Sequence, residues 1–424
     1  MLRIIKLPDY YVDLSDKRRK YSESVAPKLS FRRFRRKDNF GVHAGKRGGE
    51  TLLFSNQDID LLRLLRWCSF ISCENVTSAF PEVTIQNLRF LKMITIHQKS
   101  SSFVLTGKGN KFLDDNVDDL PVPKSSTYRE AHIQRRLHVA NLTMTAYRSG
   151  MSVFHTDPQV LEHGPSYYLT AQSRVRGFNP WGSTRVAALA RLGNTLCAIH
   201  YIFPDVGKIT LTDEINAFNN NTAGIKNVQR ALILAGKSYK EGITELDSAK
   251  EESGTRKVFY WEAYRTLTIP VYILACDDTG ALQLRIMAQP DYRRRLTMAA
   301  LKSYYQPPPK EHPEWNAMFD GAPFVMAVDM DLRRIDAAIE SARMEGFRQI
   351  AIAALDGQVK AVLNPRYRIP GLARVFTLAG ETIASLGNMT LYTPSTRQFE
   401  TREGGVIDAP IIQTDRISGR HGKK

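Results

Sequence analysis

In the first quarter of the chain, after a polar and basic start, apolar side chains recur at steps of three or four residues, the spacing of one helix face. Ser55 can cap a first predicted helix, which ends near Trp67. Ser72 can cap a second, shorter helix that ends at Phe80, just before a proline. A third helix is expected over residues 82–93. The pattern therefore predicts three helices in succession.

The pattern then changes to short runs typical of strands. Residues 94–98 and 102–106 predict two strands joined by the polar turn Lys99-Ser100-Ser101, and a short helix is expected after Gly107. Three helices followed by a hairpin is the order of a winged helix-turn-helix. In such a domain the third helix enters the major groove of DNA and the hairpin lies along the backbone. Residues 51–115 therefore predict a winged helix that binds double-stranded DNA.

The third predicted helix carries polar side chains outside its apolar face. Amide and guanidinium groups can make paired hydrogen bonds with adenine and guanine, so Gln86, Asn87 and Arg89 are expected to read bases. Lys92, and Lys99 in the hairpin turn, are expected to hold phosphates. An assembly factor whose winged helix contacts protein is an alternative. The expected contact residues of this region are Thr84, Gln86, Asn87, Arg89, Lys92 and Lys99.

A proline-bearing linker at 116–127 precedes a predicted mixed α/β domain over residues 128–415, in which a long helix at 128–150 comes first. The fold class is therefore α+β, or mixed α/β, with an N-terminal winged helix, and the sequence shows no internal repeat. Strands are predicted at 185–190, 196–203, 208–211, 231–235, 258–261, 269–276, 282–287, 324–328, 349–354, 359–363 and 389–392. Helices are predicted at 222–230, 239–249, 291–303, 332–345 and 372–385.

Charge is concentrated at the two ends of the chain. The 424 residues have a formal net charge of +16, which favours a polyanionic partner. Residues 17–47 hold twelve basic and two acidic residues, and residues 416–424 hold four basic residues and no acid. We expect a disordered basic arm over residues 1–50, a basic tail at 416–424 and a nearly neutral body between them. The arm residues expected to contact phosphates are Arg32, Arg33, Arg35 and Arg36.

Cysteine usage and hydropathy indicate the compartment. The four cysteines contain no CxxC pair, which argues against a disulfide framework or a structural zinc site. No apolar run approaches the length that spans a bilayer, and the first residues lack the apolar stretch of a signal peptide. We therefore expect a cytoplasmic protein without membrane insertion, metal or cofactor.

The strongest match to a catalytic motif is the run ALILAGKS at 231–238, a loose form of the phosphate-loop pattern, with Asp329 as a possible metal-binding acid farther on. A phosphate loop needs an open loop of four residues between its two small residues, which here would be Ala231 and Gly236. The four residues there are all apolar, which favours a buried strand ending at Gly236, with Ser238 capping the next helix. Asp329 is then expected at a helix N-terminus.

A DNA-cleaving enzyme is a further alternative. Relaxases of the histidine-hydrophobic-histidine type are disfavoured because no two histidines are one residue apart. His132 and Arg135 form an HxxR step with Tyr147 downstream, but a solvated helix face explains them better. A restriction-type metal site needs a Pro-Asp pair followed by an acid-x-Lys step. Pro204-Asp205 matches the first part, but Asp213-Glu214 is followed by Ile215-Asn216, so Asp205 is better explained as a turn residue. A non-enzymatic protein is favoured over a metal-dependent nuclease or relaxation enzyme in the α/β domain.

The run from Asn56 through NLRFLKMITI to VLTGKGNKFL, with the helix that carries His132, Leu137 and His138, resembles the replication-relaxation type of winged-helix proteins of plasmids and conjugative elements. The hairpin RVAALARLGNTLCAIHYI and the segment LILAGKSYKEGITEL resemble parts of related proteins of mobile elements. The resemblance implies a DNA-binding protein that acts in plasmid replication, transfer or regulation, with other replication or transfer proteins as partners. It implies no catalytic residue, and the long basic arm departs from the family pattern.

Overall fold

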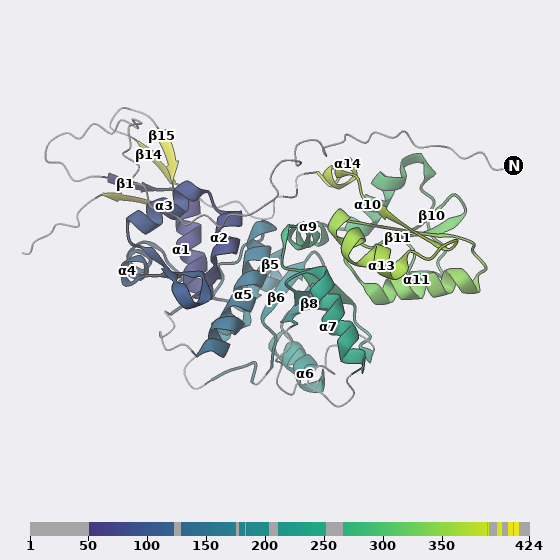
Figure 1. Cartoon of the computed structure of the whole chain (residues 1–424), viewed down its shortest axis with the longest axis horizontal. Coiled ribbons are helices and arrows are strands. Elements are labelled where there is room, and N and C mark those ends of the chain that lie inside the picture. Colours follow the sequence, from purple (N-terminus) through teal and green to yellow (C-terminus); the bar gives the residue numbers. More distant parts are fainter. Residues whose placement is uncertain are drawn as a thin grey trace, which may run out of the picture. The chain divides into compact units, whose positions relative to one another are not determined.

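The computed structural model describes a mixed α/β protein that contains several sheets (Figure 1). The predicted basic arm and tail, including Arg32, Arg33, Arg35 and Arg36, lie outside the described residues. Those residues are 51–122, 129–174, 178–182, 184–202, 211–251, 266–387, 389, 397–400, 406–409 and 411–414.

The N-terminal region is built from helices and a small three-stranded sheet. The elements are α1 (Asn56–Cys68), β2 (Ile71–Ser72), α2 (Cys73–Ala79), α3 (Glu82–Phe90), β3 (Ile94–His97), β4 (Ser102–Leu105) and α4 (Gly107–Asn116). The strands pair antiparallel in the order β2-β4-β3. The expected caps are confirmed, since the Ser55 and Ser72 hydroxyls accept hydrogen bonds from backbone amides in the first turns of α1 and α2.

The helix α3 ends three residues earlier than predicted. Lys92 takes a left-handed backbone conformation, with φ of 56°, and the Met93 amide donates back to the Leu88 carbonyl at 2.9 Å. The next helix, α4, packs closely against this turn. A Cβ atom added at Gly109 would lie 2.3 Å from the Met93 carbonyl oxygen, which explains why the second glycine of the LTGKG run has no side chain.

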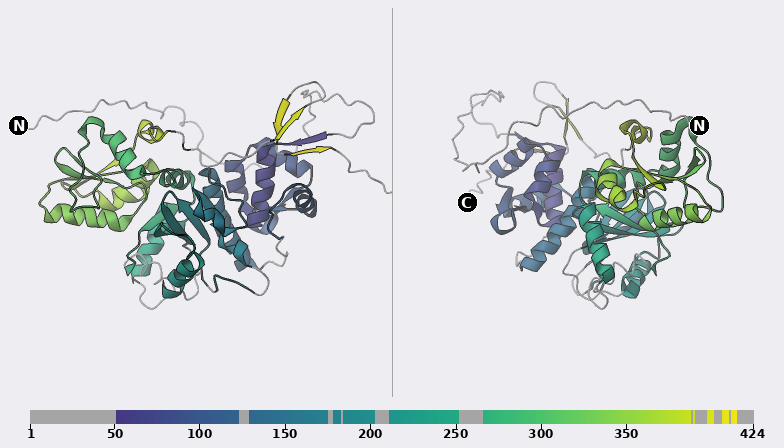
Figure 2. Two further views of the ribbon diagram at one scale, coloured as in Figure 1. Left: turned by 180° about the vertical axis from the view of Figure 1, so that it is seen from behind. Right: turned by 45° about the vertical axis from the view of Figure 1, so that its right-hand side comes forward.

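The long helix α5 (Glu130–Arg148) joins the N-terminal region to a five-stranded sheet (Figures 1 and 2). The sheet order is β5-β6-β7-β8-β9, with β6 antiparallel to both neighbours and β7, β8 and β9 parallel. Its strands are β5 (Ser166–Leu169), β6 (Ala188–Leu192), β7 (Thr195–Tyr201), β8 (Gln229–Gly236) and β9 (Val271–Ala275). Its helices are α6 (Leu211–Asn221), α7 (Tyr239–Glu251) and α9 (Asp278–Met287).

A four-stranded sheet follows, with the order β10-β11-β12-β13. The strands β10 and β11 form an antiparallel hairpin, and β12 and β13 then each pair parallel with the strand before them. The strands from β6 to β9 pair in the same way, so the topology repeats although the sequence does not. Its strands are β10 (Ala317–Phe319), β11 (Ala322–Met326), β12 (Ile350–Ala354) and β13 (Ala373–Thr377). The helices around it include α10 (Tyr292–Leu301), α11 (Leu332–Met344), α12 (Asp356–Gln358), α13 (Asn364–Tyr367) and α14 (Gly380–Ala384).

Buried amide side chains connect the two sheets. The Gln283 Nε2 atom donates to the carbonyl of Ile273 at 3.0 Å and to that of Asp329 at 2.9 Å. Gln358 Nε2 donates to the Val328 carbonyl at 2.7 Å, and the Tyr239 hydroxyl donates to Gln283 Oε1 at 2.5 Å. These bonds satisfy polar groups that would be costly to bury alone, and they hold β9 against the segment after β11.

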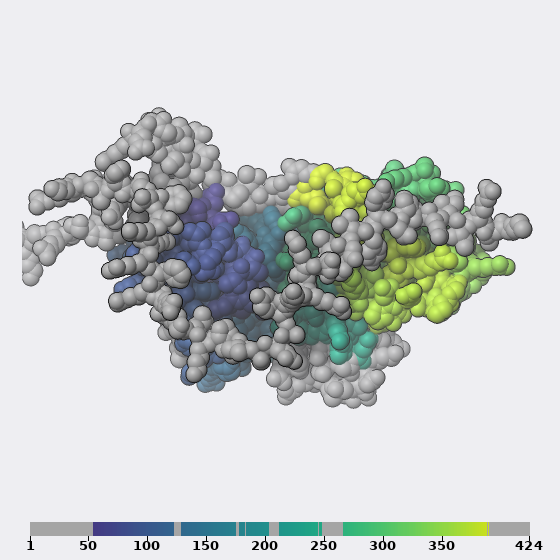
Figure 3. Space-filling model, turned by 45° about the horizontal axis from the view of Figure 1, so that its top comes forward, coloured from purple at the N-terminus to yellow at the C-terminus, as the bar shows by residue number. Residues whose placement is uncertain are grey.

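The N-terminal helices share one hydrophobic core with α5, α9 and one face of the five-stranded sheet. The surfaces of these helices and of the sheet region adjoin (Figure 3). The Arg66 side chain, which is buried, donates to the Pro121 carbonyl at 2.7 Å and pairs with Asp114. The part of the predicted linker that is described, up to residue 122, is therefore anchored to α1.

Two short two-stranded sheets contain strands from the C-terminal part of the chain. The strand β1 (Thr51–Phe54) pairs antiparallel with β16 (Ile411–Thr414), so that Thr51 faces Thr414. The strands β14 (Arg397–Glu400) and β15 (Val406–Ala409) pair with each other. None of these strands is predicted from the sequence.

Several predictions in the α/β body are wrong. Residues 282–287 are predicted as a strand but belong to α9, which Asp277 caps, and residues 359–363 form a π-helical turn. The predicted helix at 222–230 is misplaced, because α6 ends at residue 221 and β8 begins at 229. The start of the predicted helix at 372–385 is β13, with α14 after it. The strands predicted at 258–261 and over most of 208–211 and 389–392 lie outside the described residues.

Candidate functional site

A hollow of about 330 Å³ lies between the end of α3 and the β3–β4 hairpin. Its position follows from Thr106, whose hydroxyl donates to the Lys92 carbonyl at 2.7 Å and accepts from the Gly109 amide at 3.1 Å. This residue therefore fixes the end of α3 to the start of α4. The lining residues are Arg89, Lys92, Ile94, Thr95, Ile96, Gln98 and Thr106.

Next to this hollow, α3 exposes a stripe of four side chains at helical spacing. Val83 is 60% exposed and Phe90 is 86% exposed, and between them lie the exposed amides Gln86 and Asn87. Gln86 Nε2 donates to the Glu82 carboxylate at 2.9 Å, one turn earlier. The two apolar side chains stand about two turns apart on this nine-residue helix, with the two amides between them.

The structure places five of the six predicted contact residues of this region at the surface: Gln86, Asn87, Arg89, Lys92 and Lys99. Thr84 is the exception and corrects the prediction. It is 3% exposed because it precedes Ile85 on the face of α3 that packs into the core, so its hydroxyl is not accessible to DNA. The apolar members of the stripe, Val83 and Phe90, were not predicted, although both lie off the Ile85–Leu88 face in the sequence.

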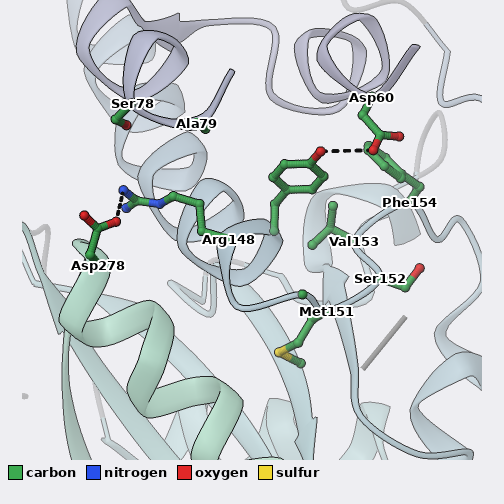
Figure 4. A pocket seen from close by; sticks show the side chains of 11 residues that line it. Asp60, Ser78, Ala79, Arg148, Met151, Ser152, Val153, Phe154 and Asp278 are labelled. Carbon is green, nitrogen blue, oxygen red and sulfur yellow. Dashed lines mark hydrogen bonds and ion pairs between the residues drawn. The ribbon is translucent and has the colours of Figure 1, made fainter. Parts of the chain in front are cut away.

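A larger hollow of about 480 Å³ lies where α1 and α2 approach the end of α5 and the start of α9 (Figure 4). Four of its polar side chains form two pairs: the Tyr147 hydroxyl donates to Asp60 at 3.0 Å, and Arg148 pairs with Asp278 at 2.9 Å. Burial raises the pKa of the Asp60 carboxyl, and burial with the nearby Asp60 charge raises the pKa of Tyr147. Tyr147 is thus a hydrogen-bond donor at neutral pH and unsuited to act as a nucleophile.

The loose phosphate-loop match is a strand. The segment from Ala231 to Gly236 lies in β8 and is buried, Lys237 is exposed, and the Ser238 hydroxyl accepts from the Glu241 amide at 3.2 Å at the start of α7. The backbone amides of a paired strand are occupied by its neighbours and cannot surround an anion. The predicted strand and helix cap are confirmed.

Asp329 has a structural role that differs from the predicted one. The residue that caps α11 is Asp331, whereas Asp329 is fully buried and accepts from the Tyr292 hydroxyl at 2.8 Å. Burial alone would raise the pKa of Asp329, but the charges of Arg293 and Arg334 outweigh it and lower this pKa to about 2. An aspartate already neutralised by two guanidinium groups is a poor ligand for a further cation.

The nuclease alternative depends on residues near the end of β7. Pro204 and Asp205 lie outside the described residues. Glu214, in α6, is 2% exposed and accepts from the Arg185 amide at 2.7 Å, and its Oε2 lies 3.9 Å from Nδ1 of the buried His200. Burial raises the pKa of Glu214 to about 7 and lowers that of His200 to about 4.

The HxxR step does not assemble with Tyr147. His132 and Arg135 are exposed in the first half of α5, and Tyr147, in its last turn, is bonded to Asp60. In the part of the chain that the structure describes, no group of three or more His, Cys, Asp or Glu side chains is placed to hold a metal ion.

No protein-family model, curated protein or solved structure matches this chain. Among the described helices, none has the length and apolar character needed to cross a bilayer.

Proposed function

We propose that this chain binds double-stranded DNA, with α3 as the recognition helix of a winged helix-turn-helix and the β3–β4 hairpin as its wing. The order α1, β2, α2, α3, β3, β4 is the order of that motif. The observation that carries the proposal is the exposed stripe of α3, in which two amide side chains stand on the face opposite the buried Ile85 and Leu88.

The chemistry of the stripe favours a site rich in A·T pairs. An asparagine or glutamine side chain can pair with the N6 and N7 positions of adenine, and an apolar side chain can contact the methyl group of thymine. In α3 the amides of Gln86 and Asn87 lie between the exposed apolar side chains of Val83 and Phe90. Arg89, beside them, is suited to a guanine at the edge of the site.

Phosphate contacts would come from the surroundings of the stripe. Lys92 lines the hollow at the end of α3, and Lys99 is exposed in the turn between β3 and β4. The twelve basic residues at positions 17–47 would add contacts that do not depend on sequence. The resemblance to replication-relaxation proteins suggests that such binding serves the replication, transfer or regulation of a mobile element.

The experiment is selection of a preferred duplex from a random pool, followed by affinity measurements for that duplex and a scrambled one. We expect Asn87→Ala and Arg89→Ala each to reduce the preference by roughly 1–3 kcal/mol. The matched control is Arg343→Ala on α11, which should leave it unchanged. Equal affinity of the unchanged protein for all duplexes at every salt concentration would refute the proposal.

The exposed Phe90 and Val83 also favour a second function, that of an assembly factor whose α3 binds a protein. The same measurements separate the two. If α3 binds protein, Phe90→Ala leaves duplex affinity unchanged, and if α3 reads DNA it weakens binding to thymine-containing sites. Incubation of the unchanged protein with supercoiled plasmid and Mg²⁺ or Mn²⁺ tests the nuclease alternative, because DNA binding alone produces no nicked product.

A further inference from the structure

Two arginines lie just outside the five-stranded sheet, at the edge that is formed by the end of β5 and the start of β6. Arg174 follows the short 3-10 turn after β5, and Arg185 lies three residues before β6. The register pairs Leu169, the end of β5, with Ala188, the start of β6. The Thr170 hydroxyl donates to the Val186 carbonyl at 2.7 Å, which holds the two segments together beyond the last strand pair.

The helix α5 brings a third arginine to this edge. The His138 ring stacks on Tyr201, the last residue of β7, with ring centroids 4.4 Å apart and planes inclined by 9°. Tyr201 belongs to the edge in question, because Ile199 of β7 pairs with Ala188. Arg135 lies one turn before His138, so it stands near the segments that carry the other two arginines.

The three guanidinium groups act on one another electrostatically. Partial shielding from water lowers the pKa of the largely exposed Arg135, and the charges of Arg185 and Arg174 lower it further. Burial and the charge of Arg185 lower the pKa of Arg174 in the same way. Three positive charges gathered in this way repel one another, and an anion between them would relieve the repulsion.

Little negative charge offsets this group of arginines. Within the described residues, none of the three forms an ion pair with a carboxylate, and the buried Nε of Arg185 has no hydrogen-bond acceptor. The Glu214 carboxyl accepts from the backbone amide of Arg185, and the charges of the Arg185 side chain and of Asp213 both act on it. Burial raises the pKa of this carboxyl to about 7, so that near neutral pH it neutralises only part of one charge. The adjoining histidines, His138 and His200, both have lowered pKa values and are neutral.

We propose that Arg135, Arg174 and Arg185 form a phosphate-binding site at the carboxyl ends of β5 and β7. Guanidinium groups match the geometry of phosphate oxygens and bind them through paired hydrogen bonds. The carboxyl ends of strands are the usual place for ligands in open α/β sheets. The site is separate from α3 and does not depend on the function proposed for that helix. Its ligand is a free phosphate compound or a phosphate of a nucleic-acid backbone.

The test uses the full chain with the substitutions Arg135→Gln and Arg174→Gln, singly and together. Both side chains are exposed, so the variants should fold, which circular dichroism and thermal unfolding check. Arg343→Gln is the matched control, since Arg343 is an exposed arginine on α11. Arg135→Lys keeps the charge and should retain part of the binding. The probes are inorganic pyrophosphate, a mononucleotide and a 20-base-pair duplex, measured by calorimetry.

We expect the double variant to lose at least ten-fold in affinity for a phosphate probe, while Arg343→Gln binds as the unchanged protein does. Loss of pyrophosphate or mononucleotide binding alone identifies a free phosphate compound. Loss of duplex binding that is equal for all sequences, with a salt slope reduced by about 0.9 for each lost contact, identifies a nucleic-acid backbone. Equal binding of all three probes by the double variant, the control and the unchanged protein would overturn the proposal.

Discussion

The polar residues of α3 and those inside the α/β body differ in what they contact. Gln86, Asn87 and Arg89 are exposed on a short helix, with one intrahelical bond from Gln86 to Glu82. Asp329 and Gln283 are buried, and each has several partners within the chain. Groups of the first kind are available to a ligand, whereas groups of the second kind already stabilise the fold.

The difference predicts how substitutions in the two regions behave. Changes on α3 should alter binding and leave the free energy of unfolding nearly constant, because exposed side chains contribute little to stability. Changes at the buried groups should lower the free energy of unfolding and affect binding only through loss of folded protein. The three arginines at the sheet edge stand between these cases, since Arg185 has a buried Nε while Arg135 and Arg174 are exposed.

The largest effect is expected for Asp329→Asn. This change leaves Arg293 and Arg334 without their buried counter-charge and should cost about 3–5 kcal/mol in the free energy of unfolding at neutral pH. The pKa of Asp329 is lowered to about 2 from 3.8, so the stabilisation is present above pH 4 and is lost as the pH falls toward 2. Urea unfolding at several pH values measures it.

Two results would contradict the structural role of Asp329. Unchanged stability of Asp329→Asn would remove the structural role, and a magnesium-dependent activity lost in this variant would place Asp329 in a metal site. The control is Asp336→Asn, on the exposed side of α11, which should change the free energy of unfolding by less than about 0.5 kcal/mol.

A smaller effect of opposite pH dependence is expected at Glu214. Its folded pKa of about 7 exceeds the ordinary value of 4.5, so the folded protein holds this proton more tightly than the unfolded chain. Stability should therefore fall by up to about 3 kcal/mol as the pH rises from 4.5 to 7, and Glu214→Gln should remove this dependence. Unfolding free energies of both proteins at pH 5 to 8 give the difference.

The difference in unfolding free energy between the two proteins separates the contribution of Glu214 from those of its charged neighbours. Arg185, Asp213 and His200 remain in the variant, and the lowered pKa of His200 acts in the opposite direction, because stability from a neutral histidine is lost as the pH falls from 6.5 toward 4. Parallel stability curves for the two proteins would show that Glu214 titrates normally, and the charge balance inferred for the sheet edge would then need revision.

Local signals explain which parts of the fold were predictable. The helices after Ser55 and Ser72 each begin at a capping serine and have apolar side chains at helical spacing. The strand that ends at Gly236 is an apolar run followed by a capping serine. These elements form as expected. The apolar run at 282–287 has no such boundary of its own. It is the second half of a helix that Asp277 caps, and Gly280 allows that helix to approach the Ala275 carbonyl.

The candidate sites were predictable to different degrees. Residues of one helix reveal their common face through spacing, so the exposure of Gln86, Asn87 and Arg89 was predictable, whereas Thr84 was placed on the wrong face. The arginines at the sheet edge come from three elements and meet only through the strand register. The partner of Asp329, Arg293, is likewise 36 positions away, and no short-range pattern indicates it.

Photocrosslinking shows most directly whether α3 reads DNA bases. A photoreactive phenylalanine analogue replaces the exposed Phe90 of α3 in one variant and the exposed Met344 of α11 in another. Both are irradiated with the selected duplex and with a scrambled one. We expect a crosslink from position 90 to a base of the selected duplex, and none from position 344. A folded position-90 variant that crosslinks only to protein, or equally to both duplexes, would contradict base reading by α3.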